Sequence, residues 1–166
     1  MNVFEHAMQM EKDGQTYYEK QAAGTTSTAL KRIWEQLASD EIKHYEIFRR
    51  LRDGEIDRAA DLVAVGSETL AKAKTIFAEL SEKNEKLDFG DDVFKAWDKA
   101  LDLEIKTEKY YREKESEEKN DKVKKAFAIL ADEENKHAHL IEHVLEFLNQ
   151  PKQWLDDAEW SNLDKH

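Results

Sequence analysis

Two segments of the chain place a glutamate three residues before a histidine. One runs from Glu41 to His44 and the other from Glu134 to His137. Residues three apart lie on the same face of a helix, and in both segments this face also carries the apolar residues. A carboxylate on a buried face must be paired with a cation or bound to a metal. The two segments therefore indicate buried carboxylate and imidazole groups that bind metal.

An internal repeat supplies two further glutamates. The first half of the chain aligns with the second at a constant offset of 93 residues, and the polar residues on the apolar faces stay in register. The pairs related by this offset are Glu11 and Glu104, Tyr18 and Tyr111, Glu41 and Glu134, and His44 and His137. We expect two similar helical hairpins that pack about a pseudo-two-fold axis and bring both halves of one site together.

The candidate metal ligands form a set of four carboxylates and two imidazoles. They are Glu11, Glu41, His44, Glu104, Glu134 and His137. One glutamate from each of two helices, with a Glu-x-x-His pair from each of the other two, is the ligand pattern of ferritin-like di-iron and di-manganese proteins. Four carboxylates balance two divalent cations, and oxygen and nitrogen ligands suit iron(II) or manganese(II). The ligand types leave two irons, two manganese ions or a mixed pair open.

Several nearby residues have more than one interpretation. Tyr18 and Tyr111 lie seven residues after two of the candidate glutamates, and they either donate to a ligand carboxylate or serve as core tyrosines. Glu108 is either a seventh ligand or a carboxylate at the rim of the bundle, and we favour the rim. Glu133 lies four residues before the second histidine and competes with Glu134, but the repeat and the apolar stripe select Glu134.

We expect an all-α, ferritin-like four-helix bundle over residues 1–150. The apolar spacing predicts long helices at about residues 3–23, 28–52, 92–117 and 121–149. Residues 54–90 are too many for an ordinary bundle loop and predict a long crossover that contains one shorter helix, near residues 70–80. The tail, residues 151–166, contains two tryptophans and is expected to pack on the bundle or on a partner subunit.

The composition excludes several classes of function. The chain has 166 residues, a net charge of -11 and no cysteine. The negative charge argues against a nucleic-acid partner and against docking on an anionic membrane. The absence of cysteine excludes iron–sulfur clusters, cysteine-based zinc sites and thiol nucleophiles. No segment has the pattern of a secretory signal or a membrane span, so we expect a cytoplasmic protein.

With these motifs in place, the sequence resembles the rubrerythrin family of ferritin-like proteins over nearly its whole length. The matching segments are Met10-Glu11-Lys12 with Tyr17-Tyr18, Leu37 to His44, Leu103-Glu104 with Tyr110-Tyr111, Leu130 to His137, and the tail from Pro151 to Trp160. The resemblance implies a non-haem di-iron site that reduces hydrogen peroxide to water with electrons from rubredoxin. It also implies a homodimer that serves in oxidative-stress defence.

The chain differs from the best-known members of this family in two respects. Full-length rubrerythrin carries a rubredoxin domain whose iron is held by four cysteines, and this chain has no cysteine. Electrons must therefore come from a separate donor, such as rubredoxin. The family also carries a second glutamate three residues after the ligand on the third long helix, where this chain has Thr107, followed by Glu108.

Three functional hypotheses are compatible with this pattern. The first is a di-iron oxidoreductase that reduces hydrogen peroxide. The second is a ferroxidase or iron-handling protein that oxidises added iron(II) with dioxygen. The third is a non-catalytic helical module that retains its metal site for stability.

Overall fold

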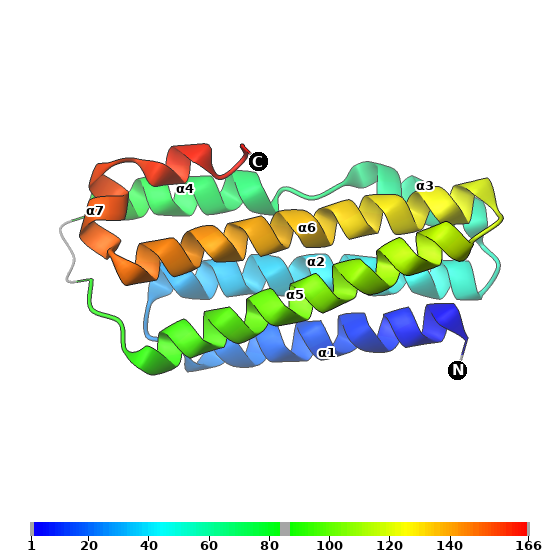
Figure 1. Ribbon diagram of the computed structural model, residues 1–166, viewed down its shortest axis with the longest axis horizontal. Coiled ribbons are helices and arrows are strands. Elements are labelled where there is room, and N and C mark those ends of the chain that lie inside the picture. The colour runs from blue at the N-terminus through cyan, green and yellow to red at the C-terminus, as the bar shows by residue number, and fades with distance from the viewer. Residues whose placement is uncertain (1, 84–86, 166) are drawn as a thin grey trace.

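The protein is a bundle of four long helices that run side by side along its length (Figure 1). The computed structural model describes residues 2–83 and 87–165, and every regular element within them is helical. The four long helices are α1 (Val3–Gly24), α2 (Thr28–Arg52), α5 (Asp91–Glu117) and α6 (Asp121–Asn149). The first two form one hairpin, and the last two form the other. The predicted all-α, ferritin-like bundle is confirmed.

Three of the four long helices begin where the sequence offers a capping side chain, and α5 begins after Gly90 without one. Asn2 accepts a hydrogen bond from the backbone N–H of Glu5 at 2.8 Å, and Ser27 accepts one from Leu30 at 3.2 Å. Asn120 accepts two, from the second and third residues of α6. Each of these bonds satisfies a backbone donor that lacks a partner within the helix. Both ends of each long helix lie within one residue of the predicted ends.

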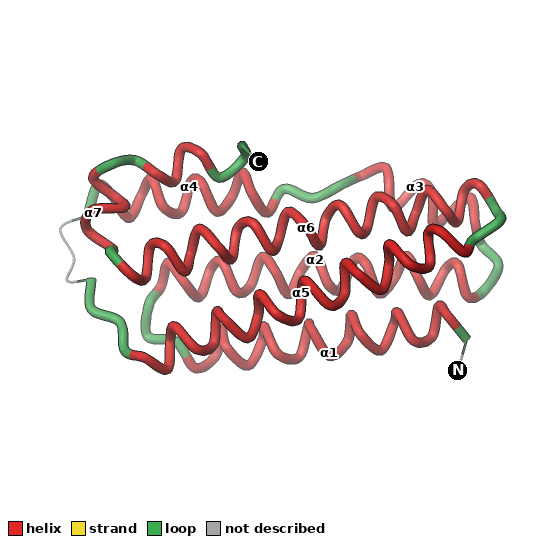
Figure 2. The backbone as a smooth tube through the Cα atoms, in the orientation of Figure 1, coloured by secondary structure: helices red, strands yellow, loops and turns green. Residues whose placement is uncertain are grey.

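The crossover contains two helices instead of the single one predicted. They are α3 (Ile56–Val65) and α4 (Thr69–Ser81), and the second is the helix expected near residues 70–80. The prediction missed α3 because it buries only Ala59 and Val63, and two apolar positions are too few to show a helical period. Both helices pack on α2 and α6, along the same side of the bundle (Figure 2). Residues 84–86 of the predicted crossover lie outside the described residues.

The C-terminal tail folds back over α4 as the short helix α7 (Pro151–Asp156) and a 3₁₀ turn, η1 (Glu159–Asn162). Pro151 occupies the first helical position of α7, where its missing N–H has no cost. Trp154 is buried against Phe77 of α4 and Phe147 of α6, with ring centroids 4.7 and 5.5 Å apart. The tail therefore joins the crossover to the second hairpin. His166 lies outside the described residues.

Each long helix carries apolar residues at both ends and polar residues in its middle. On α2, for example, Leu37 belongs to one apolar cluster and Phe48 to another, and Glu41 and His44 lie between them. The same order holds on α1, α5 and α6. Near one end, Trp34 and Trp97 stack with ring centroids 3.6 Å apart and connect the two hairpins. The bundle therefore has two apolar cores with a polar layer between them.

The outer faces of the helices are charged. Glu46, for example, forms ion pairs with Arg49 and Arg50 along the solvent side of α2. Among the described residues, no helix is both long enough and apolar enough to cross a membrane. Most large apolar residues of the long helices face the two cores, whereas Ile42, Phe94 and Ile105 are exposed.

Replacing Trp154 by Ala tests how much the tail contributes to stability. The indole is buried between α4 and α6, so its loss leaves a cavity and should lower the free energy of unfolding by about 3–5 kcal/mol. Urea denaturation of metal-free protein measures this change. Lys152→Ala, which removes an exposed side chain from the same helix, is the matched control and should change stability little. Equal stability of the two variants would contradict this account of the tail.

Candidate metal centre

All six candidate ligands lie in the polar layer between the two apolar cores. Glu11 comes from α1, Glu104 from α5, and one Glu-x-x-His pair from each of α2 and α6. Each of the six side chains is buried, and none is more than 4% exposed. The described part of the chain contains no buried Lys or Arg. The repeat in the sequence thus corresponds to one compact cluster of acids and imidazoles.

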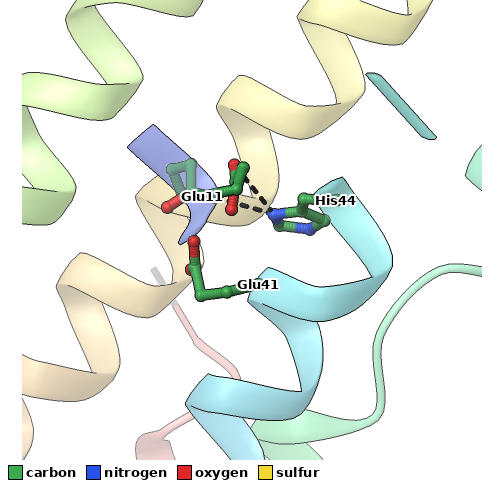
Figure 3. A group of neighbouring side chains, drawn as sticks. Glu11, Glu41 and His44 are labelled. Carbon is green, nitrogen blue, oxygen red and sulfur yellow. Dashed lines mark hydrogen bonds and ion pairs between the residues drawn. The ribbon is translucent and has the colours of Figure 1, made fainter. Parts of the chain in front are cut away.

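The cluster divides into two overlapping groups of possible metal ligands. One group contains Glu11 and His44, the other contains Glu104 and His137, and both include Glu41 and Glu134. Within each group, one ligand atom per residue can be chosen so that all lie within 4.8 Å of one another. Figure 3 shows part of the first group, where Glu11 of α1 approaches His44, and Glu41 lies on the same helix as His44, α2. Two shared carboxylates between two groups form an arrangement suited to a pair of metal ions.

Each histidine directs its Nδ1 atom into the cluster. Nδ1 of His44 lies 2.8 Å from Glu134 and 3.4 Å from Glu11. Nδ1 of His137 lies 3.4 Å from Glu104 and 3.5 Å from Glu41. Nδ1 is therefore the atom of each imidazole that is placed to bind a metal.

The opposite nitrogen of each histidine contacts a carboxylate from the other hairpin. Nε2 of His137 lies 2.8 Å from Asp40 on α2, and Nε2 of His44 contacts Glu133 on α6. A carboxylate in this position fixes the ring orientation and tautomer of a metal-binding histidine. This role was not predicted for Asp40 or Glu133 from the sequence. The repeat offered a signal, because the 93-residue offset relates them and each directly precedes a candidate ligand.

The two core tyrosines also bond across the hairpins. The hydroxyl of Tyr18 donates to Glu104, and the hydroxyl of Tyr111 donates to Glu11 at 2.5 Å. Burial raises the pKa of both phenols, and the nearby carboxylates raise it further, led by Glu104 for Tyr18 and by Glu11 for Tyr111. The phenols therefore stay protonated at neutral pH and remain donors. Of the two interpretations of these tyrosines, the structure shows the hydrogen bond to a candidate ligand.

Glu108 lies at the rim of the bundle and outside both ligand groups. Its side chain is 22% exposed, and it accepts hydrogen bonds from Arg112 and Asn135. The hydroxyl of the preceding residue, Thr107, donates a hydrogen bond to the backbone carbonyl of Leu103 at 2.9 Å. Neither side chain therefore enters the polar layer.

Gly14 makes room for one of the shared carboxylates. It lies inside α1, and a Cβ at this position would come within 3.1 Å of Oε2 of Glu41. Glycine inside a helix is about 1 kcal/mol less favourable than alanine, so its presence here needs a reason, and close approach of Glu41 provides one. The signal in the sequence was an isolated glycine within a helical pattern.

Burial and mutual repulsion control the protonation of the cluster. Burial raises the pKa of Glu41 and Glu134, and repulsion from the neighbouring glutamates raises it further. Burial, the largest single effect, would lower the pKa of His44 and His137. Attraction to the nearby carboxylates, led by Glu11 for His44 and Glu104 for His137, and the hydrogen bonds to carboxylates together outweigh burial and raise the pKa of both. Without metal, the cluster therefore holds protons where a cation would otherwise supply positive charge.

The chemistry of this donor set fits a pair of divalent cations. Three buried carboxylate oxygens, Oε2 of Glu11, Oε1 of Glu41 and Oε2 of Glu104, have no hydrogen-bond partner among the described residues. Such atoms are costly to bury unless a ligand or water satisfies them. The four ligand carboxylates carry four negative charges, which two divalent cations neutralise. The cluster is therefore able to bind metal.

The fold and the cluster define a ferritin-like protein with a buried carboxylate and histidine site. A sequence model of the rubrerythrin family matches residues 95–162, which include most of α5, all of α6 and α7, and η1. The match covers less than half of the chain and supports a relationship of this short chain to the rubrerythrin family. No curated protein and no solved structure matches the chain.

The raised pKa values of the cluster predict how pH affects stability. Because Glu41, Glu134, His44 and His137 bind protons more tightly when folded, the metal-free protein should lose stability as pH rises through about 5 to 8. Metal binding displaces these protons, so the stabilisation by added Mn(II) should grow over the same range. Urea denaturation at several pH values, with chelator or with Mn(II), measures both trends. Stability of the chelated protein that rises with pH would contradict the prediction.

Substituting Gly14 by Ala separates helix stability from metal binding. The new methyl group should favour α1 by up to about 1 kcal/mol in metal-free protein. It should also displace Glu41 and weaken Mn(II) binding by about tenfold or more, as loss of a supporting contact commonly does. Gly24→Ala is the matched control, because a Cβ there meets no atom within 4 Å. Wild-type Mn(II) affinity in the Gly14 variant would show that the space beside Glu41 is unimportant.

Proposed function

We propose that this protein is a non-haem di-iron oxidoreductase that reduces hydrogen peroxide to water. The observation that carries the proposal is the pair of ligand groups that share Glu41 and Glu134 and contribute one inward-facing histidine each. In the proposed reaction, one peroxide molecule takes up two electrons and two protons and gives two molecules of water. A bound iron pair would supply both electrons together, as cleavage of the O–O bond requires.

The side chains around the cluster would hold the ligands in place during this reaction. Tyr18 and Tyr111 donate to Glu104 and Glu11, respectively, and limit the rotation of these carboxylates. Burial raises the pKa of both phenols. We therefore propose that they orient the ligand carboxylates and do not donate protons to the peroxide. Asp40 and Glu133 hold the two imidazoles from outside the cluster. Two apolar cores flank the polar layer and limit access of bulk water from either end of the bundle.

We propose that a separate protein supplies the electrons. A one-electron carrier such as rubredoxin suits this role, and two transfers would restore the reduced site. We further propose a homodimer that works in the cytoplasm in defence against peroxide. These proposals rest on the resemblance to the rubrerythrin family, to which the matching sequence model points.

Stopped-flow mixing of the iron(II)-loaded protein tests the proposed reaction. Anaerobic protein is mixed with hydrogen peroxide or with dioxygen at equal concentration, and oxidation is followed by absorbance. We expect peroxide to oxidise the protein much faster and the iron to remain bound afterwards. The control variant Glu41→Gln/Glu134→Gln, which loses both shared carboxylates, should bind iron poorly and give no comparable signal.

Two other results would each overturn the proposal in favour of a different function. Faster oxidation by dioxygen, with repeated turnover of added iron(II) and release of iron(III), would identify a ferroxidase. Metal binding that raises the melting temperature, without redox turnover by either oxidant, would identify a metal-stabilised structural module.

A further inference from the structure

The carboxylate that holds His137 is itself fixed by two hydroxyl groups. Oδ2 of Asp40 lies 2.8 Å from Nε2 of His137 and accepts hydrogen bonds from Ser67 and Thr69, each at 2.6 Å. The Asp40 side chain is 4% exposed, and Thr69 is buried. Three donors around one buried oxygen leave this carboxylate little freedom to rotate.

Both hydroxyl groups belong to the crossover and not to either hairpin. Ser67 directly follows Gly66, whose positive φ of 73° ends α3, and Thr69 is the first residue of α4. The hydroxyl of Ser67 also accepts a hydrogen bond from the backbone N–H of Thr69 at 3.1 Å, which orders the start of α4. A segment outside the repeat therefore determines the orientation of one histidine.

The other histidine, His44, is oriented by a carboxylate that is less firmly fixed. Its partner, Glu133, corresponds to Asp40 in the repeat but has one more rotatable bond, and its side chain is 11% exposed. No hydroxyl group of the described residues bonds to Glu133, whose carboxylate contacts His44. A longer and partly exposed side chain loses more conformational entropy when it is held in one orientation. The two halves of the site therefore have the same ligand types, but the carboxylates that orient their histidines differ in how firmly they are fixed.

We propose that the crossover makes the two metal positions unequal, with Ser67 and Thr69 acting through Asp40 to fix His137. The position formed by Glu104 and His137 should then bind a divalent cation more tightly than the position formed by Glu11 and His44. The inference rests on the proposed metal site and assigns Ser67, Thr69 and Asp40 as positioning residues.

The physical basis of this inequality is preorganisation. A ligand that is already held in its binding orientation loses less freedom when the metal arrives, and this raises affinity. Hydrogen-bond partners of metal ligands commonly change metal affinity by about 10- to 100-fold. The first cation would also neutralise part of the charge on the shared Glu41 and Glu134, so the second would bind to a less negative site. Two separate binding steps follow.

Titration with Mn(II), followed by the electron paramagnetic resonance signal of the free ion, tests the inference. Wild-type protein should bind two ions in two resolved steps. Thr69→Val removes the hydroxyl at similar volume and should weaken the first step by about tenfold while leaving the second unchanged. Thr69→Ser retains a hydroxyl group and should bind both ions with wild-type affinity. Glu133→Gln should weaken only the second step.

A second variant keeps the test independent of folding. Ser67 is exposed, so Ser67→Ala leaves the core intact and should also weaken the first step, by less than Thr69→Val. A crystal structure at one equivalent of Mn(II) should show the ion beside His137. A single binding step in wild-type protein, an ion beside His44, or equal weakening of both steps by Thr69→Val would each overturn the inference.

The same titration separates this inference from the proposed function. Two resolved steps without peroxide reduction would leave the inequality intact and remove only the proposed reaction. Two equal binding steps with rapid peroxide reduction would keep the reaction and overturn the inequality. No binding of Mn(II) at all would overturn the inference together with the metal site on which it rests.

Discussion

The burial of four glutamates at one level of the bundle is the constraint on which the rest of the structure depends. Burial of these charges in a packed apolar core would be energetically unfavourable. Each long helix therefore interrupts its apolar face with polar residues at the same level of the bundle. The described residues include no buried Lys or Arg to balance them. The helices instead surround the glutamates with imidazole and phenol groups, and the side chains of Asp40 and Glu133 hold the imidazoles. Two divalent cations would complete the neutralisation.

Much of this arrangement could be predicted from the sequence, because helical spacing and the repeat are local patterns. The long helices, the six clustered side chains and the rim position of Glu108 follow from which residues share a face. The role of Asp40 could not be predicted in this way. Spacing within α2 suggests a contact with His44, whereas the bond runs across the bundle to His137 and depends on how the hairpins rotate against each other. Ser67 lies in a short polar connection and Thr69 is the first residue of α4, so no helical periodicity in the sequence indicated the role of either residue.

The crossover has two distinct physical roles. As a connection, it carries the chain from the end of one hairpin to the start of the other, and α3 and α4 cover part of α2 and α6 on the way. As a support, it directs two hydroxyl groups at Asp40. The repeat creates a nearly symmetric site, and the segment between the repeats is what makes it asymmetric. The tail strengthens the same side, since Trp154 packs on α4.

The exchange of hydrogen bonds between the hairpins also bears on how such a chain could have arisen. Each hairpin holds two candidate glutamates and a histidine, but the groups that orient them, Asp40, Glu133, Tyr18 and Tyr111, all reach across to the opposite hairpin. A single hairpin of this kind could therefore complete the site only by pairing with a second copy of itself. Duplication and fusion of a self-associating hairpin would produce the two repeated halves of this chain, with the crossover and the tail as additions to them.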